Sequence, residues 1–240
     1  MSDKPSKRYV FIFTFIMCLV SGLLLTAAST VLKERQNRNI EIDKQKNVLK
    51  SVGLINKEVV YSNSDIESLF KENIREYFVG PSGEILESNK NANDLLQLYL
   101  YNKKSKLVSY IIPIETRGLW GKIKGYLALN NDGSTIVGFS VYSHAETPGL
   151  GGEIEQGWFQ DNFVGKRIIN DKNSFVSISI AKGRVKDAIS EDMKDNYVDG
   201  ISGATLTGSY LSKGLSSILA RYEKVSVRFR QDYLKNRPSN

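Results

Sequence analysis

The stretch from Tyr9 to Leu32 contains no charged residue, and it constrains the fold more than any other feature of the chain. As a helix rising 1.5 Å per residue it would be roughly 36 Å long, which is enough to cross a bilayer. A cleaved signal peptide has a shorter apolar region and a small-residue cleavage site, to which Ala27-Ala28-Ser29 is a weak match. The length favours an uncleaved transmembrane helix.

The flanking charges leave the orientation of this helix open, because basic residues lie on both sides of it. They are Lys4, Lys7 and Arg8 before the helix, and Lys33, Arg35 and Arg38 after it. A large domain that follows a first anchor can be exported largely regardless of its charge.

The net charge of +7 does not by itself indicate a nucleic-acid partner. Lysines and arginines are spread along the chain and interleaved with acids, and no nucleic-acid-binding motif is present. A basic region beside a membrane explains part of the excess. We therefore expect a lipid bilayer, and no nucleic acid, among the partners.

The chain has one cysteine, Cys18, and one histidine, His144. Neither a disulfide framework nor a cysteine- or histidine-cluster metal site can be built from them. We expect no metal site, and a redox function would depend on an organic cofactor.

The pattern of elements predicts an α+β fold, with an antiparallel, curved sheet and helices packed on it. The expected organisation is a short N-terminus (1–8), a transmembrane helix (9–32), a stalk and N-terminal region (33–115), a cofactor domain (116–225) and a polar tail (226–240).

Two helices are expected before the sheet. The first is a stalk from Lys33 to about Asn56. The second opens at the capping box Ser64-Asp65-Ile66-Glu67, carries Ile66, Leu69, Phe70, Ile74 and Phe78 on one side, and ends at Gly80-Pro81-Ser82-Gly83.

Several strands are expected after a polar loop over 84–94. Residues 106–112 are strand-like, and 122–129 and 135–142 flank the turn Asn130-Asn131-Asp132-Gly133, which predicts an antiparallel hairpin. Val176, Ile178 and Ile180 alternate with serines, as in a half-buried strand.

The segment Asp199–Gly208 (Asp-Gly-Ile-Ser-Gly-Ala-Thr-Leu-Thr-Gly) combines a turn with the start of a helix. Leu211, Leu215, Ile218, Leu219 and Tyr222 then form one helical stripe. Thr207 or Ser209 is a suitable N-cap with an exposed hydroxyl, and free amides at a helix N-terminus attract anions. The alternative is an ordinary capped helix after a loop.

Two other segments carry candidate site residues. The loop His144–Gly152 (His-Ala-Glu-Thr-Pro-Gly-Leu-Gly-Gly) is rich in glycine and would expose its backbone, although an ordinary structural turn has the same composition. Trp120, in Gly-Leu-Trp-Gly, and Lys182 are further candidates. A lone tryptophan is more often core, and a lysine is more often solvated.

Along the chain the order is Gly-Leu-Trp, then Glu-Thr-Pro-Gly-Leu-Gly-Gly-Glu-Ile, then Asp-Gly-Ile-Ser-Gly-Ala-Thr-Leu-Thr. In this order the three motifs resemble the C subunit of the bacterial Na+-translocating NADH:quinone oxidoreductase, a family with a covalent-FMN-binding domain. The resemblance implies that a flavin transferase joins FMN through its phosphate to the hydroxyl of Thr207. It also implies that the loop and Trp120 lie against the flavin. The cofactor-binding residues expected on this basis are Thr207, Ser202, Gly203, Ala204, Thr205, Leu206, Glu146, Thr147, Gly149, Leu150, Gly151, Trp120, His144 and Lys182.

The same resemblance implies that Leu150 packs on the ring and that Glu146 accepts a hydrogen bond from a flavin N–H or a ribityl hydroxyl. The residue types suggest two further roles. An imidazole suits proton exchange near neutral pH, so His144 is a candidate proton relay, and Lys182, at the end of a strand, would place its ammonium near the phosphate or the ring. No catalytic residue acts on a substrate, since electrons pass through FMN.

The function implied is a membrane-anchored subunit of the bacterial inner membrane that relays electrons from NADH towards quinone in a Na+-pumping complex. Its flavin domain would be extracytoplasmic, and its partners would be the other membrane and flavoprotein subunits. Two alternatives are the G-type subunit of the Rnf electron-transport complex, which shares the flavin motif, and an anchored anion-binding module without cofactor.

Overall fold

The structure, a computed structural model, describes residues 6–56, 59–87, 95–104 and 106–235. The chain divides into two compact units, Met1–Asp43 and Lys44–Asn240. Helix α1 (Lys7–Ser51) begins in the first unit and ends in the second.

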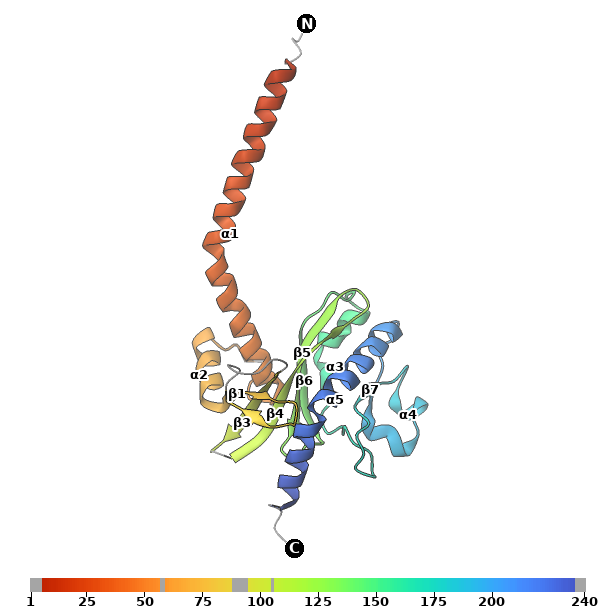
Figure 1. The fold of residues 1–240 in the computed structure, drawn as a ribbon. Coiled ribbons are helices and arrows are strands. Elements are labelled where there is room, and N and C mark those ends of the chain that lie inside the picture. Colours follow the sequence, from red (N-terminus) through yellow and green to blue (C-terminus); the bar gives the residue numbers. More distant parts are fainter. Residues whose placement is uncertain (1–5, 57–58, 88–94, 105, 236–240) are drawn as a thin grey trace. The chain divides into compact units, whose positions relative to one another are not determined.

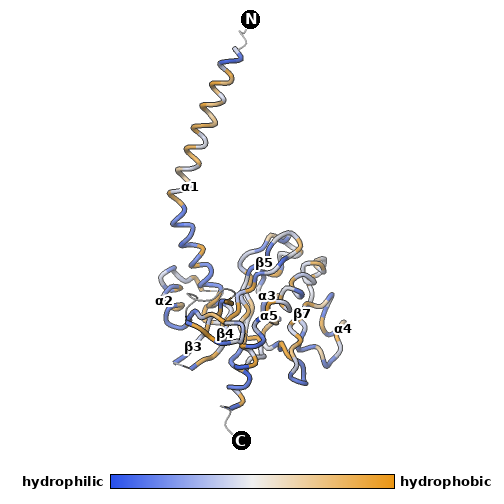
Figure 2. The backbone as a smooth tube through the Cα atoms, in the orientation of Figure 1, coloured by the Kyte–Doolittle hydropathy of each residue, from blue (hydrophilic) through white to orange (hydrophobic). Residues whose placement is uncertain are grey.

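Helix α1 contains the apolar stretch predicted to span a membrane. Among the described residues it is the one helix long and apolar enough to do so. Figure 2 shows the change along α1 from an apolar N-terminal half to a hydrophilic C-terminal half. The stalk expected from Lys33 is the continuation of the same helix to Ser51.

The second unit is built on a six-stranded antiparallel sheet, which confirms the α+β expectation (Figure 1). Its strand order is β2-β1-β3-β4-β5-β6. The strands are β1 (Ile74–Val79), β2 (Ile85–Leu86), β3 (Leu96–Lys103), β4 (Lys106–Arg117), β5 (Lys122–Asn130) and β6 (Ile136–Ser143). Register shifts in the β3–β4 and β5–β6 pairs add bend and twist to the sheet, because an extra residue on one strand kinks the ladder.

Strand β4 is buried on both faces, so its sequence is a run of apolar residues and not an alternation. Tyr110, Ile111 and Ile112 are all fully buried. Pro113 interrupts this run without loss of sheet pairing. The ladder between β3 and β4 extends only to the pair Tyr99–Ile111, so the missing amide of Pro113 falls beyond it.

Helices cover both faces of the sheet. Helix α5 (Thr205–Lys235) lies across one face, and its stripe of buried residues includes Leu211, Leu215, Leu219 and Tyr222, as predicted. Helix α2 (Asn63–Asn73) packs on the other face, where the ring of Phe70 meets Tyr99 edge-on.

Short elements connect β6 to α5. They are the 3-10 helices η1 (Gly151–Glu155) and η2 (Glu191–Asn196), the helices α3 (Gly157–Asp161) and α4 (Val185–Ala188), and the parallel pair β7 (Ser179–Ile180) and β8 (Tyr197–Val198).

Two details predicted for helix α2 are wrong. The capping box uses Ser62 as N-cap and Asp65 as its partner, two residues before the predicted Ser64. The helix also ends at Asn73, because Ile74–Val79 pairs with β3 as strand β1. Four of the six residues of this segment are β-branched or aromatic, and cross-strand pairing prevails over the helical spacing of Ile74 and Phe78. The loop expected over 84–94 contains strand β2, and residues 88–94 lie outside the described part.

The strand expected over Val176–Ile180 is reduced to the two residues of β7. Ser177 has a positive φ of 69° and is buried, whereas Val176 is 43% exposed. The alternating apolar and polar residues from Val176 to Ile180 therefore do not form a continuous strand.

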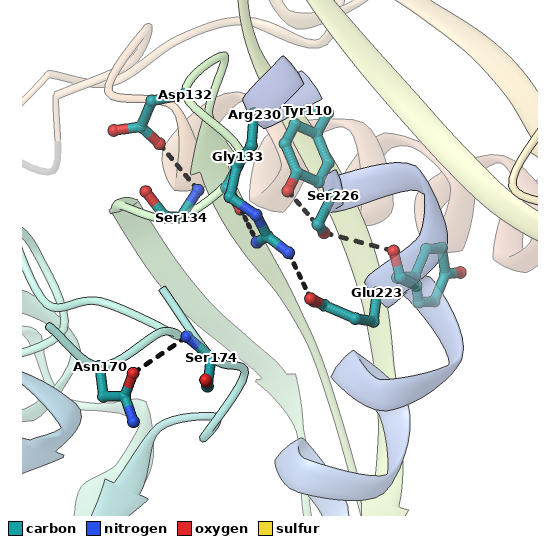
Figure 3. A network of polar contacts seen from close by, with 10 residues as sticks. Tyr110, Asp132, Gly133, Ser134, Asn170, Ser174, Glu223, Ser226 and Arg230 are labelled. Carbon is teal, nitrogen blue, oxygen red and sulfur yellow. Dashed lines mark hydrogen bonds and ion pairs between the residues drawn. The ribbon is translucent and has the colours of Figure 1, made fainter. Parts of the chain in front are cut away.

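The residues expected as a polar tail continue helix α5 as far as Lys235. Figure 3 shows how this end of the helix is held. The Tyr110 hydroxyl donates to Ser226 Oγ at 2.8 Å, and Arg230 donates to the carbonyl of Gly133 at 2.8 Å while it pairs with Glu223. The hairpin turn between β5 and β6 is thereby joined to the last turns of α5.

Candidate functional site

Helix α5 begins at Thr205, so Thr207 is its third residue and not the N-cap that the sequence predicted. The turn before it depends on Gly203, which has a φ of +73°. Ser202, Thr205 and Leu206 are exposed, while Ala204 is buried. Thr207 is only 1% exposed, so the expectation of an exposed cap hydroxyl is wrong. Its side chain points into the protein because it lies on the face of α5 that packs on the sheet.

The loop between β6 and η1 folds back on itself through backbone hydrogen bonds. The amides of Leu150 and Gly152 both donate to the carbonyl of Thr147, at 3.1 and 2.9 Å. Gly149 adopts a φ of +73°, a conformation that favours glycine. This tight turn places Glu146 inward, where only 5% of the residue is exposed.

Glu146 joins the three motifs that the sequence singled out. Its Oε2 accepts a hydrogen bond from the Thr207 hydroxyl at 2.5 Å, although 61 residues separate the two. Its Oε1 accepts from the backbone amide of Trp120 at 3.0 Å. One buried carboxylate therefore connects the start of α5, the glycine-rich loop and the turn before β5.

Glycines allow this close approach. A Cβ atom on Gly118 would lie 2.5 Å from Glu146 Oε1, and one on Gly151 would lie 2.7 Å from Glu146 Oε2. No side chain fits at either position without displacing the carboxylate.

A cavity of about 340 Å³ opens beside the Thr207–Glu146 pair. Its lining consists of Leu119, Trp120, Glu146, Thr147, Leu150, Gly151, Gly203, Ala204, Thr205, Leu206 and Thr207. Four of these residues are large, apolar and solvent-exposed, namely Leu119, Trp120, Leu150 and Leu206. Exposed apolar side chains gathered around a concave polar centre are typical of a ligand site.

The residues present fit a flavin nucleotide. Trp120 is 71% exposed, which excludes the alternative of a core tryptophan, and its indole is free to cover a planar ring. The hydroxyl of Thr207 lies in the first turn of α5, where the helix dipole favours a phosphate.

Four of the predicted site residues lie outside the lining of this cavity: Ser202, Gly149, His144 and Lys182. Ser202 and Lys182 are exposed, and a Cβ on Gly149 would meet nothing within 4 Å. Conversely, Leu119 lines the cavity and was not predicted. The signal for it was its place beside Trp120 in the Gly-Leu-Trp-Gly turn.

His144 stabilises the loop without lining the cavity. Its Nδ1 accepts a hydrogen bond from the backbone amide of Glu146 at 3.1 Å. The ring proton is therefore on Nε2, which lies 3.1 Å from Glu155 Oε2. This pattern fixes the ring in one tautomer and positions the backbone of Glu146.

Known proteins with similar sequence share this domain. Residues 118–220 match the FMN-binding domain family. The C subunit of the Na(+)-translocating NADH-quinone reductase from Pseudomonas aeruginosa is 30% identical over 249 residues, covering 91% of this chain and 92% of that protein. The corresponding protein from Yersinia pestis is 29% identical, covering 87% of this chain and 88% of that protein.

Solved structures show the same fold. The crystal structure of the C subunit from Parabacteroides distasonis superposes with a TM-score of 0.69 at 30% identity, covering 81% of this chain and 96% of that one. The Shewanella oneidensis NqrC structure, at 21% identity, has a TM-score of 0.64 and covers 84% of this chain and 100% of that one, a likeness of fold alone. With its FMN-binding domain and its similarity over nearly the full length of these relatives, the chain belongs to the family of the C subunit of the Na(+)-translocating NADH-quinone reductase.

Proposed function

We propose that this chain carries FMN as a phosphoester on Thr207 and relays electrons from NADH towards quinone in a Na+-pumping membrane complex. The observation that carries this proposal is the buried Thr207 hydroxyl, which lines a cavity surrounded by exposed apolar side chains. The exposed tryptophan and leucines beside this hydroxyl do not contribute to the buried core, so a bound ligand explains their position better than folding does.

The residues of the cavity suit the parts of the nucleotide. Thr207 would bear the phosphate, and Trp120 and Leu150 would pack against the ring. The turn around Thr147 and Gly151 would offer backbone groups to its polar edge. Bound FMN supplies exchange of one or two electrons, and its potential is set by this environment.

The flavin ring needs contacts with the protein in addition to the ester bond. The ribityl chain between phosphate and ring contains several rotatable bonds, so an ester to Thr207 alone would not fix the ring. Electron transfer needs a defined ring position, which the loop over His144–Gly152 and the turn with Trp120 would provide.

The test is co-expression of the full chain with a flavin transferase, followed by flavin fluorescence of the band on a denaturing gel. We expect a fluorescent band and an FMN-bearing tryptic peptide modified at Thr207. Thr207→Ala should abolish it, and the exposed Thr205→Ala should retain it. A colourless wild-type chain would favour the cofactor-free anion-binding module, and modification at Thr205 or Ser209 would move the attachment site.

The wider assignment has two further parts. Family membership favours the quinone-reductase subunit over the G-type subunit of the Rnf complex. Membranes that contain the chain should show quinone-dependent activity in the first case and ferredoxin-dependent activity in the second.

We also propose that α1 is an uncleaved anchor in the bacterial inner membrane and that the domain after it is extracytoplasmic. An active C-terminal alkaline phosphatase fusion and a purified chain starting near Met1 are expected.

A further inference from the structure

Glu146 is a buried carboxylate. Among the described residues, none of its contacts is an ion pair, and both of its oxygens accept from neutral donors, the Thr207 hydroxyl and the Trp120 amide. Removing a carboxylate from water is costly unless it is paired. The two neutral donors do not offset this cost as an ion pair would, so the presence of a carboxyl group at this position needs a chemical explanation.

From this geometry we propose that Glu146 accepts the Thr207 proton when the flavin is attached, so that the domain carries its own base. The proposal rests on the proposed function, since it concerns modification of the same threonine. The geometric requirement for a base is a heavy-atom distance of about 2.6–3.2 Å to the group that loses the proton. Glu146 Oε2 lies 2.5 Å from Thr207 Oγ1, just below the lower limit of this range.

The step balances without an oxidant or reductant. An FMN phosphomonoester has no good leaving group, so the donor must be a flavin nucleotide activated as a phosphoric anhydride, namely a flavin dinucleotide brought by the transferase. Thr207 Oγ1 forms the new bond to phosphorus as the anhydride P–O bond breaks and a nucleoside monophosphate leaves. The hydroxyl proton passes to Glu146.

The burial of Thr207 favours a base from the modified chain over a base from the transferase. Thr207 is 1% exposed, and its hydroxyl already donates to Glu146. Gly151 also packs against this hydroxyl, since a Cβ at position 151 would lie 2.5 Å from the Thr207 oxygen. A base provided by the transferase would have to displace Glu146 to reach the proton, whereas phosphorus can approach from the cavity that Thr207 lines.

Proton transfer to Glu146 also removes a conflict of charge. The attached phosphodiester has a negative charge, and an ionised carboxylate buried beside it would repel it. A neutral Glu146 avoids this repulsion, and its new O–H can donate a hydrogen bond in place of the one that it accepted.

The competing explanation is that Glu146 only holds three segments together. Glu146→Gln separates the two, because the amide keeps the shape, can accept from Trp120 and can donate to the Thr207 oxygen, but cannot take up a proton. The experiment mixes the purified full chain, expressed without flavin, with transferase and flavin dinucleotide. Gain of FMN mass by the intact chain is followed in time.

We expect Glu146→Gln to lower the rate of attachment about 100-fold, within the range typical of a lost general base, with a melting temperature close to wild type. As a second variant, Glu146→Ala should also be slow, and added formate should restore part of its rate by acting as a small carboxylate. A wild-type rate for Glu146→Gln, or a Glu146→Ala rate that formate leaves unchanged, would overturn the proposal. Failure of the wild-type chain to take up flavin would instead count against the proposed function.

Discussion

Gly151 packs so closely against Thr207 that a Cβ atom at position 151 would lie 2.5 Å from the threonine hydroxyl oxygen. Real Cβ atoms do not approach so near, so even alanine must displace Thr207 or Glu146. The glycine-rich loop is therefore part of the geometry of the attachment site as well as a turn.

Gly151→Ala should slow covalent attachment of flavin and lower the free energy of unfolding by about 1–3 kcal/mol, the usual cost of overpacking. Intact mass after a fixed reaction time and chemical denaturation measure the two effects. Gly183→Ala is the matched control, because a Cβ there meets nothing within 4 Å. Equal behaviour of the two variants would show that the loop does not hold Thr207.

Thr207→Ala should destabilise the apoprotein more than Thr205→Ala, even though both lie in the first turn of α5. Loss of the Thr207 hydroxyl leaves a buried carboxylate oxygen of Glu146 without its donor, at a cost of about 1–3 kcal/mol. Thr205 is exposed, and its replacement should change stability by less than about 0.5 kcal/mol. Urea denaturation of flavin-free chains gives the comparison, and equal midpoints would contradict it.

Phe229→Ala should strongly destabilise the domain, although the sequence places this residue in an apparently polar tail. Its ring is 8% exposed and stacks on Tyr110 with centroids 4.5 Å apart. Large-to-small changes of buried aromatic residues cost about 3–5 kcal/mol. The control is Tyr233→Ala, four residues further along α5, where the side chain is 42% exposed. If both variants melt alike, the end of α5 is not part of the core.

Stability should fall as pH rises above about 10 because of two buried tyrosines. Burial raises the pKa of Tyr110 and of Tyr222 above the ordinary value of 10.0. In this alkaline range the unfolded chain loses phenol protons that the native state keeps, so deprotonation stabilises the unfolded state relative to the folded one. Each tyrosine contributes a slope of up to about 1.4 kcal/mol per pH unit.

Denaturation midpoints between pH 9 and pH 11 measure this effect. The double variant Tyr110→Phe/Tyr222→Phe should show a shallower fall, although it is less stable near neutral pH because it lacks the hydrogen bonds to Ser226 and to the carbonyl of Gln97. An unchanged slope would show that other groups control alkaline unfolding.

Local patterns in the sequence were sufficient for several elements. The uncharged stretch over 9–32 forms a helix, the turn at Asn130–Gly133 joins β5 to β6, and the stripe from Leu211 to Tyr222 is the buried face of α5. Each of these depends on side chains a few residues apart, whose periodicity is a local property of the chain.

Other elements were decided by contacts distant in sequence. Ile74 and Phe78 have helical spacing with Ile66 and Phe70, but pairing with β3 makes Ile74–Val79 a strand. The segment from Val225 to Lys235 is helical because the hairpin turn at Gly133 and the ring of Tyr110 pack against it. Neither partner can be identified from the segment itself.

The candidate site shows the same division. The sequence by itself predicted which motifs form the site, and it placed Thr207 near the start of a helix beside small residues. Only the tertiary structure decided that Thr207 is buried, that it donates to Glu146 across 61 residues of sequence, and that Trp120 and Leu119 flank the same cavity while His144 and Lys182 do not line it. The physical reason is that hydrogen bonding and burial depend on which elements pack together, and this packing is set by the sheet and α5 as a whole.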